Sequence, residues 1–184
     1  MGFGPLGRLV HAQSLTNTMK TPEPVIAFDI HPTRIGYAVV SKSGPIDWGV
    51  TRLRRPPLQT SKYLDRLVAE LCRLWQPAVA IIRKSRRDRQ RHSKVISRAL
   101  ASRGIPVRKV LDRPVSRPGK GPTKNELACD LARRYPELKH LLPRKRRLWE
   151  PEDDRMHIFT AVGLAILFSP RTGKKEIQIG QVAE

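Results

Sequence analysis

The chain has 184 residues, of which 36 are Lys or Arg and 16 are Asp or Glu, so its formal net charge is +20 at pH 7. This charge favours a polyanionic partner, and the 39% of hydrophobic residues exclude a purely basic tail, because a chain of this length and composition can bury a core. No basic amphipathic helix stands alone, and the long apolar run over 158–168 is too short to span a bilayer, so we expect no membrane partner.

Composition divides the chain into three segments. Residues 1–24 lack the continuous apolar stretch of a secretory signal and are predicted to be a disordered leader. Residues 25–169 are predicted to form one folded domain, and 170–184 a flexible tail. Cys72 and Cys129 lie on separate helical patterns without a neighbouring Cys or His pair, which predicts buried free thiols in a reducing cytoplasm.

The folded domain begins with strand patterns over 25–30, 35–41 and 46–53, separated by short turns, which predict an antiparallel meander. Helical spacing and short apolar runs alternate after it. The further predicted elements are helices over 58–76, 93–102, 123–134 and 153–168 and strands over 78–82 and 107–111. Thr123 and Glu126 have the spacing of a capping box and predict the start of the third of these helices. This order predicts an α/β fold: a mixed five-stranded sheet, made of the meander plus parallel strands, with helices on both faces.

Asp29 lies inside the apolar run of the first strand. An ionised carboxylate is costly to bury unless a cation or several donors compensate it, so this position indicates a functional site. In strand geometry Asp29 shares a face with Val25 and Ala27. The alternative is that Asp29 ends the strand and caps the turn at His31 and Pro32.

A second acidic group, Glu152, Asp153 and Asp154, lies at the predicted start of the last helix. Asp154 and His157 have the i, i+3 spacing that puts two side chains on one helix face. Carboxylates here can hold a metal ion, or they can stabilise the positive end of the helix dipole without binding anything. The residues alone leave both interpretations open.

The order of elements, together with these two acidic positions, resembles the ribonuclease H-like nuclease fold and, more narrowly, the RuvC-type crossover (Holliday) junction endonucleases. The segments that carry the resemblance are 26–29, 36–39, 79–82, 123–128 and 149–157. The resemblance implies a metal-dependent, structure-selective endonuclease that acts on branched DNA in recombination and repair. It also implies a homodimer in a bacterial-type cytoplasm, associated with the nucleoid.

The same resemblance implies a centre with Mg²⁺ or Mn²⁺, in which one ion activates water and another stabilises the leaving oxygen. The implied metal ligands are Asp29, Glu152, Asp153 and Asp154. The implied catalytic residues are Asp29, Asp153, Asp154 and His157, with His157 as an auxiliary ligand or base.

The sequence departs from the family pattern at two positions. Arg83 stands where the resolvases carry a Glu, and Thr160 stands where relatives often have a carboxylate. An inward cation about 5 Å from a divalent ion would repel it by roughly 6 kcal/mol at an effective dielectric constant near 20. Either Arg83 turns toward solvent or a DNA phosphate, or another acidic residue such as Glu150 or Glu152 replaces the lost ligand. The chain is then a weakly active or specialised nuclease.

The alternative is a catalytically impaired, nuclease-derived DNA-binding protein. A basic RNA- or ribosome-associated protein is a third and weaker interpretation.

Basic residues are concentrated in three segments, and each segment is expected to contact DNA phosphates. The expected nucleic-acid-binding residues are Arg83, Lys84, Arg86, Arg87, Arg89, Arg91, Lys120, Lys124, Arg144, Lys145, Arg146 and Arg147. Any one run taken alone is equally typical of a solvated face or a localisation signal. Trp149 is the one aromatic candidate for stacking on a base, the alternative being a Trp that anchors a loop to the core.

Overall fold

The structure is a computed structural model, and it describes residues 23–53, 57–84, 91–111, 123–144, 147 and 149–169. Almost all of the predicted leader, residues 1–22, and the predicted tail lie outside these ranges. The same holds for some of the expected DNA-binding residues, namely Arg86, Arg87, Arg89, Lys120, Lys145 and Arg146.

The described strands form one mixed sheet of five strands in the order β3-β2-β1-β4-β5. Three of them, β1 (Val25–His31), β2 (Arg34–Ser41) and β3 (Gly44–Arg52), make the predicted antiparallel meander. The other two, β4 (Val79–Lys84) and β5 (Val107–Leu111), continue the sheet in parallel from β1. The predicted strand content and mixed topology are confirmed.

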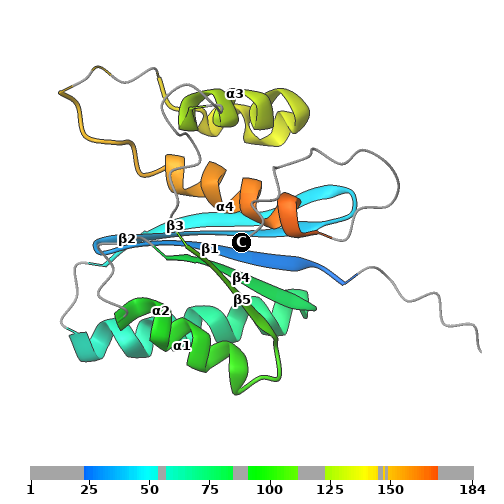
Figure 1. Cartoon of the computed structure of the whole chain (residues 1–184), viewed down its shortest axis with the longest axis vertical. Coiled ribbons are helices and arrows are strands. Elements are labelled where there is room, and N and C mark those ends of the chain that lie inside the picture. Colours follow the sequence, from blue (N-terminus) through cyan, green and yellow to red (C-terminus); the bar gives the residue numbers. More distant parts are fainter. Residues whose placement is uncertain are drawn as a thin grey trace, which may run out of the picture.

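Helices cover both faces of this sheet (Figure 1). One face is covered by α1 (Pro57–Trp75) and α2 (Arg91–Ala101). The other face carries α4 (Met156–Phe168), and α3 (Lys124–Arg134) packs on α4. Asp29 of β1 and His157 of α4 meet between the sheet and the first turn of α4.

The first strand is buried on both faces because it lies in the middle of the sheet. Ile26, Phe28 and Ile30 belong to the core beneath α1 and α2, whereas Val25 and Ala27 belong to the core beneath α4. The predicted alternation along β1 is therefore confirmed. The same alternation places Asp29, two residues beyond Ala27, on the face of the sheet that α4 covers.

Hydrogen bonds between residues close in the sequence fix the start of α3. The predicted capping box at the start of α3 is present: the Thr123 amide donates to Glu126 Oε2 at 2.6 Å, and the Glu126 amide donates to Thr123 Oγ1 at 3.2 Å. A short 3₁₀ helix, η1 (Pro136–Leu141), follows α3 and was not predicted. The Pro at its first position favours such a turn and has no amide hydrogen to lose.

The predicted start of the last helix was wrong by three residues. The helix α4 begins at Met156, so Asp153 and Asp154 lie in the turn before it rather than in its first helical turn. Asp153 instead accepts a hydrogen bond from the Arg155 amide at 2.9 Å, as Asp side chains commonly do in turns.

Both cysteines are free thiols, as predicted, but each is half-buried rather than buried. Burial raises the pKa of the Cys72 thiol, against an opposing effect of Arg103. Within the described ranges, every helix is too short or too polar to cross a membrane.

Candidate functional site

Asp29 and Arg83 face each other across the centre of the sheet. The parallel register pairs Asp29 of β1 with Arg83 of β4, and paired residues in neighbouring strands present their side chains on the same face. Arg83 Nη1 donates to Asp29 Oδ1 at 3.4 Å, and both side chains are at least 90% buried. The register of the two strands therefore directs a cation onto the carboxylate.

On the other side of β1, a glycine lets α4 approach the sheet. Asp29 pairs with Gly36 of β2, and a Cβ atom at Gly36 would lie 2.4 Å from the carbonyl oxygen of His157. The missing side chain leaves room for the first turn of α4 directly above Asp29. His157 Nδ1 lies 2.7 Å from Asp29 Oδ2, and His157 is also buried. Each oxygen of Asp29 thus has its own partner.

His31 closes the site at the end of β1. Its ring centroid lies 5.6 Å from that of His157, with the two rings tilted by 46°. Burial lowers the pKa of His31 below its usual value, and the neighbouring His157 and Arg34 add to this effect, while Asp29 opposes it. His31 is thereby favoured in its neutral form.

The three carboxylates before α4 do not join Asp29. Lys124 Nζ lies 2.8 Å from a Glu152 oxygen, and the Arg155 guanidinium lies 2.7 Å from Asp153. The hydrogen bonds from Arg155 hold the pKa of Asp153 below its usual range. Asp154 is paired with two arginines of the meander, Arg34 and Arg52. Each carboxylate therefore lies against a separate cation.

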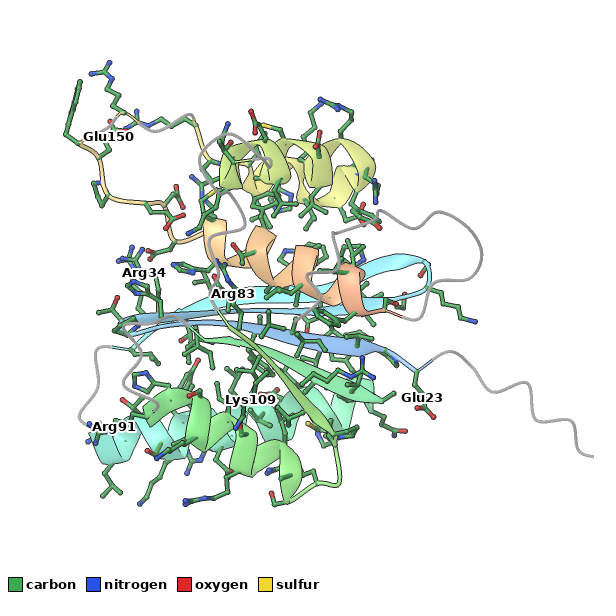
Figure 2. All side chains as sticks on the ribbon, in the orientation of Figure 1. Glu23, Arg34, Arg83, Arg91, Lys109 and Glu150 are labelled. Carbon is green, nitrogen blue, oxygen red and sulfur yellow. The ribbon has the colours of Figure 1, made fainter. Side chains whose placement is uncertain are left out.

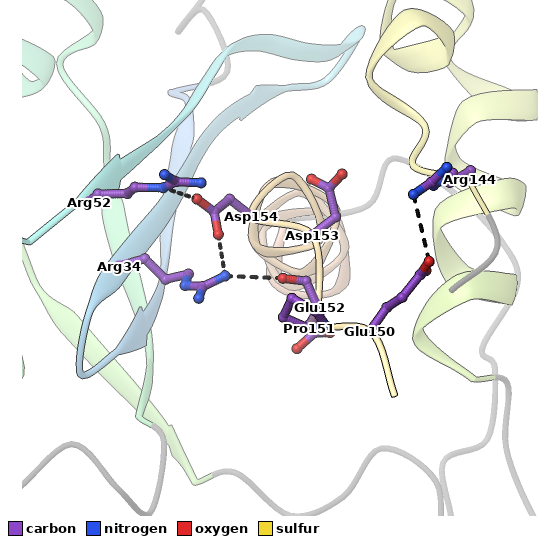
Figure 3. Close-up of a pocket in the computed structure, with 8 residues that line it drawn as sticks. All are labelled: Arg34, Arg52, Arg144, Glu150, Pro151, Glu152, Asp153 and Asp154. Carbon is purple, nitrogen blue, oxygen red and sulfur yellow. Dashed lines mark hydrogen bonds and ion pairs between the residues drawn. The ribbon is translucent and has the colours of Figure 1, made fainter. Parts of the chain in front are cut away.

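The carboxylates Glu152, Asp153 and Asp154 line a polar cavity of about 420 Å³, together with Arg34 and Arg52 of the meander. Figure 3 shows Asp154 between Arg34 and Arg52 and, across the cavity, Glu150 pointing toward Arg144. Arg34 also donates to the Glu152 carbonyl at 3.1 Å. The segment that was expected to supply metal ligands is thus fixed to the meander by arginines.

The expected DNA-binding residues that the structure describes are divided between the interior and the surface. Arg83 is only 8% exposed, so it does not lie on a DNA-facing surface as expected. Lys84 ends β4. Arg91, Lys124, Arg144 and Arg147 are exposed, and Lys124 is paired with Glu152.

The exposed cations lie near the end of the sheet where β1 and β4 finish. Figure 2 shows Arg34, Arg91 and Glu150 at one side of the molecule and Glu23 at the opposite side. Arg144 pairs with Glu150 and so belongs to the same side. We call this side, with Arg91, Arg144 and Arg147, the basic edge. Ligands of open α/β sheets commonly bind at the carboxyl ends of the parallel strands.

No protein-family model and no curated protein matches this chain. Solved structures do match it. The structure of T. thermophilus RuvC in complex with a Holliday junction substrate has a TM-score of 0.55 and 17% sequence identity, over 78% of this chain and 91% of that chain. The structure of the Fowlpox virus resolvase with substrate Holliday junction DNA has a TM-score of 0.51 and 16% identity, over 77% of this chain and 97% of that chain.

The chain has the fold of RuvC-type resolvases. This confirms the predicted ribonuclease H-like architecture, a mixed five-stranded sheet with helices on both faces. Identities of 16–18% show the fold alone, so the chemistry has to be argued from the residues of this chain.

The divalent metal ions that the resemblance implies do not fit the side chains of this site. Binding a pair of ions needs several carboxylate oxygens directed at a common point. Here each Asp29 oxygen contacts a neighbouring side chain, and Glu152, Asp153 and Asp154 are each paired with Lys or Arg side chains. In the described part of the chain, no three His, Cys, Asp or Glu side chains are placed to hold one ion. Thr160 supplies no carboxylate, and its hydroxyl donates to the Met156 carbonyl at 2.9 Å.

Sequence reasoning missed three residues that shape this site: Gly36, Arg34 and Arg52. An isolated glycine inside a strand pattern signals a close backbone approach, so Gly36 could have been found. The two arginines carried no local signal, because they reach Asp154 from positions 120 and 102 residues away in the sequence.

Proposed function

We propose that this protein binds branched DNA through the basic edge of its resolvase fold and does not cleave it. The observation that carries the proposal is the position of Arg83. Its guanidinium is buried against Asp29, at the point where a nuclease of this fold would need a carboxylate facing a metal ion.

The charge of Arg83 opposes catalysis by metal ions. A guanidinium about 5 Å from a divalent ion would raise its energy by roughly 6 kcal/mol at an effective dielectric constant near 20. Asp29 has a different role in this arrangement. It accepts from Arg83 of β4 and contacts His157 of α4, so it links two strands and a helix. We infer that the buried triad of Asp29, Arg83 and His157 stabilises the fold.

The surface supports DNA as the partner. The net charge of +20 favours a polyanion, and the exposed arginines of the basic edge lie where open α/β sheets bind ligands. Two structures with this fold were solved with Holliday junction DNA, which supports a four-way junction as the first substrate to test. The homodimer implied by the resemblance remains a prediction, and light scattering with and without the junction checks it.

The test combines binding and cleavage on one substrate. Fluorescence anisotropy with a labelled four-way junction should show binding, with a slope of log K against log salt near −5 if about six phosphates are neutralised. The same junction incubated with Mg²⁺ or Mn²⁺ should stay intact, beside a resolvase of known activity as positive control. Specific cleavage that Asp29→Asn abolishes would overturn the proposal, and so would a failure to bind at low salt.

A further inference from the structure

Trp149 is the most exposed large apolar side chain in the described part of the chain. Its exposed fraction is 77%. This excludes the interpretation of Trp149 as an anchor that packs a loop onto the core. A large aromatic side chain that stays in water does not gain the free energy that its burial would provide. Its exposure is therefore typical of a surface that binds a partner.

The backbone around Trp149 is held by hydrogen bonds at both ends of a turn. The Glu150 amide donates to the Arg147 carbonyl at 3.1 Å, and the Arg147 amide donates to Glu150 Oε2 at 3.2 Å. Figure 1 shows residues 149–155, which lead into α4, extending away from both α3 and α4. These hydrogen bonds hold the backbone of the turn, and the Trp149 ring is exposed on it. Less conformational entropy is therefore lost when the ring binds a partner.

The chemistry around the ring is basic. The Arg147 guanidinium lies 5.7 Å from the centre of the Trp149 ring, in reach of a cation–π interaction. The Arg144 side chain, which is 88% exposed, pairs at 3.6 Å with Glu150, the residue that follows Trp149. An aromatic ring beside a guanidinium suits a nucleotide: the ring stacks on the base, and the cation contacts a phosphate beside it. An apolar protein surface would instead leave this charge facing an apolar partner.

We propose that Trp149 and Arg147 form a stacking site for an unpaired base of branched DNA. Bases inside a duplex already stack on both neighbours, so their faces are not accessible, whereas a base at a gap or in a single-stranded arm has an open face. This inference rests on the proposed DNA binding and adds the part of the substrate that the protein recognises. Trp149 would favour DNA with unpaired bases over intact duplex.

The test compares two DNA molecules and three variants of the full chain. One DNA is a blunt duplex, and the other is the same duplex with a short single-stranded gap that carries 2-aminopurine. Trp149→Ala should weaken binding to the gapped DNA about tenfold and leave duplex binding within about twofold, because stacking on one base contributes about 1–3 kcal/mol. Trp149→Phe should retain most of the preference. Leu58→Ala, which removes another exposed apolar side chain, on α1, is the matched control and should change neither affinity.

Fluorescence gives a second readout that a merely structural role of Trp149 would not produce. The wild-type protein should quench 2-aminopurine in the gap, and Trp149→Ala should not. Equal loss of affinity for both DNA molecules, or unchanged quenching by Trp149→Ala, would overturn this inference while leaving DNA binding intact. A wild-type protein that binds neither DNA would overturn the proposed function first, and this inference with it.

Discussion

The buried pair of Arg83 and Asp29 gives the sharpest test of the site, because removing one partner takes away the opposite charge that lies against the other. We expect Arg83→Met to leave the Asp29 carboxylate with His157 as its remaining partner among the two described above. The substitution keeps an unbranched side chain of similar length, so the loss of charge dominates over the loss of packing.

The size of the effect follows from burial. Breaking a buried ion pair by removing one partner costs about 3–5 kcal/mol, and the 3.4 Å separation together with the retained His157 contact favours the lower end. A loss of about 3 kcal/mol corresponds to a fall in Tm of roughly 10 °C for a domain of this size. The exposed pair of Arg133 and Asp130, at 3.2 Å, is the matched control, and Arg133→Met should cost less than about 1 kcal/mol.

A double-mutant cycle measured by urea denaturation completes the test. Asp29→Asn alone should also destabilise, since it removes the negative charge that lies against the buried guanidinium, whereas the double variant Arg83→Met with Asp29→Asn should cost clearly less than the sum of the two. We expect a coupling energy of about 2 kcal/mol. Additive effects within about 0.5 kcal/mol, or an Arg83→Met variant as stable as the Arg133→Met control, would show that the pair does not tie β1 to β4.

Three further predictions test the surroundings of the site. Gly36→Ala should destabilise by about 1–3 kcal/mol in urea denaturation, because its Cβ would overlap the His157 backbone. Gly163→Ala should be neutral or stabilising, because its Cβ would meet only methyl groups, of Leu127 and Leu131, the nearest at 3.4 Å. The pKa of His31 is lower in the folded state than its usual value of 6.5, so the unfolded chain binds more protons and the free energy of unfolding should fall as pH drops below about 6.5. His31→Gln should flatten this part of the curve of stability against pH. An unchanged curve would contradict a lowered pKa of His31. Replacing Arg91 and Arg144 by Ala should lower the salt slope of DNA binding by about 2 without shifting Tm, because both are exposed, and an unchanged slope would remove them from the interface.

Much of the fold could be predicted because it depends on local patterns. The apolar alternation of β1 assigned the two faces of the central strand, and the Thr123 and Glu126 pair marked the start of α3. The sequence also identified Asp29 as exceptional, since an acidic residue in a buried strand requires compensation. What it could not decide was whether Arg83 turns inward, because that depends on the register between strands separated by a helix.

The start of α4 could not be predicted from the local sequence of the acidic segment before it. Asp153 and Asp154 have the spacing and composition of a first helical turn, yet the helix begins at Met156. Arginine side chains bind these carboxylates, which therefore do not cap or begin the helix. Arg155 engages Asp153 within the turn, while Arg34 and Arg52 reach Asp154 from the meander. Contacts over such long sequence separations leave no periodic signal.

These ion pairs also predict how the protein should depend on metal ions. In a nuclease with unpaired carboxylates, the acidic centre repels DNA phosphates until a divalent ion neutralises it. Here Arg83 neutralises Asp29, and Lys124, Arg155, Arg34 and Arg52 neutralise the carboxylates before α4. DNA binding at constant ionic strength should therefore be the same in EDTA as in Mg²⁺. A junction affinity that rises tenfold with Mg²⁺ would show instead that the carboxylates release their internal cations and bind the metal ion.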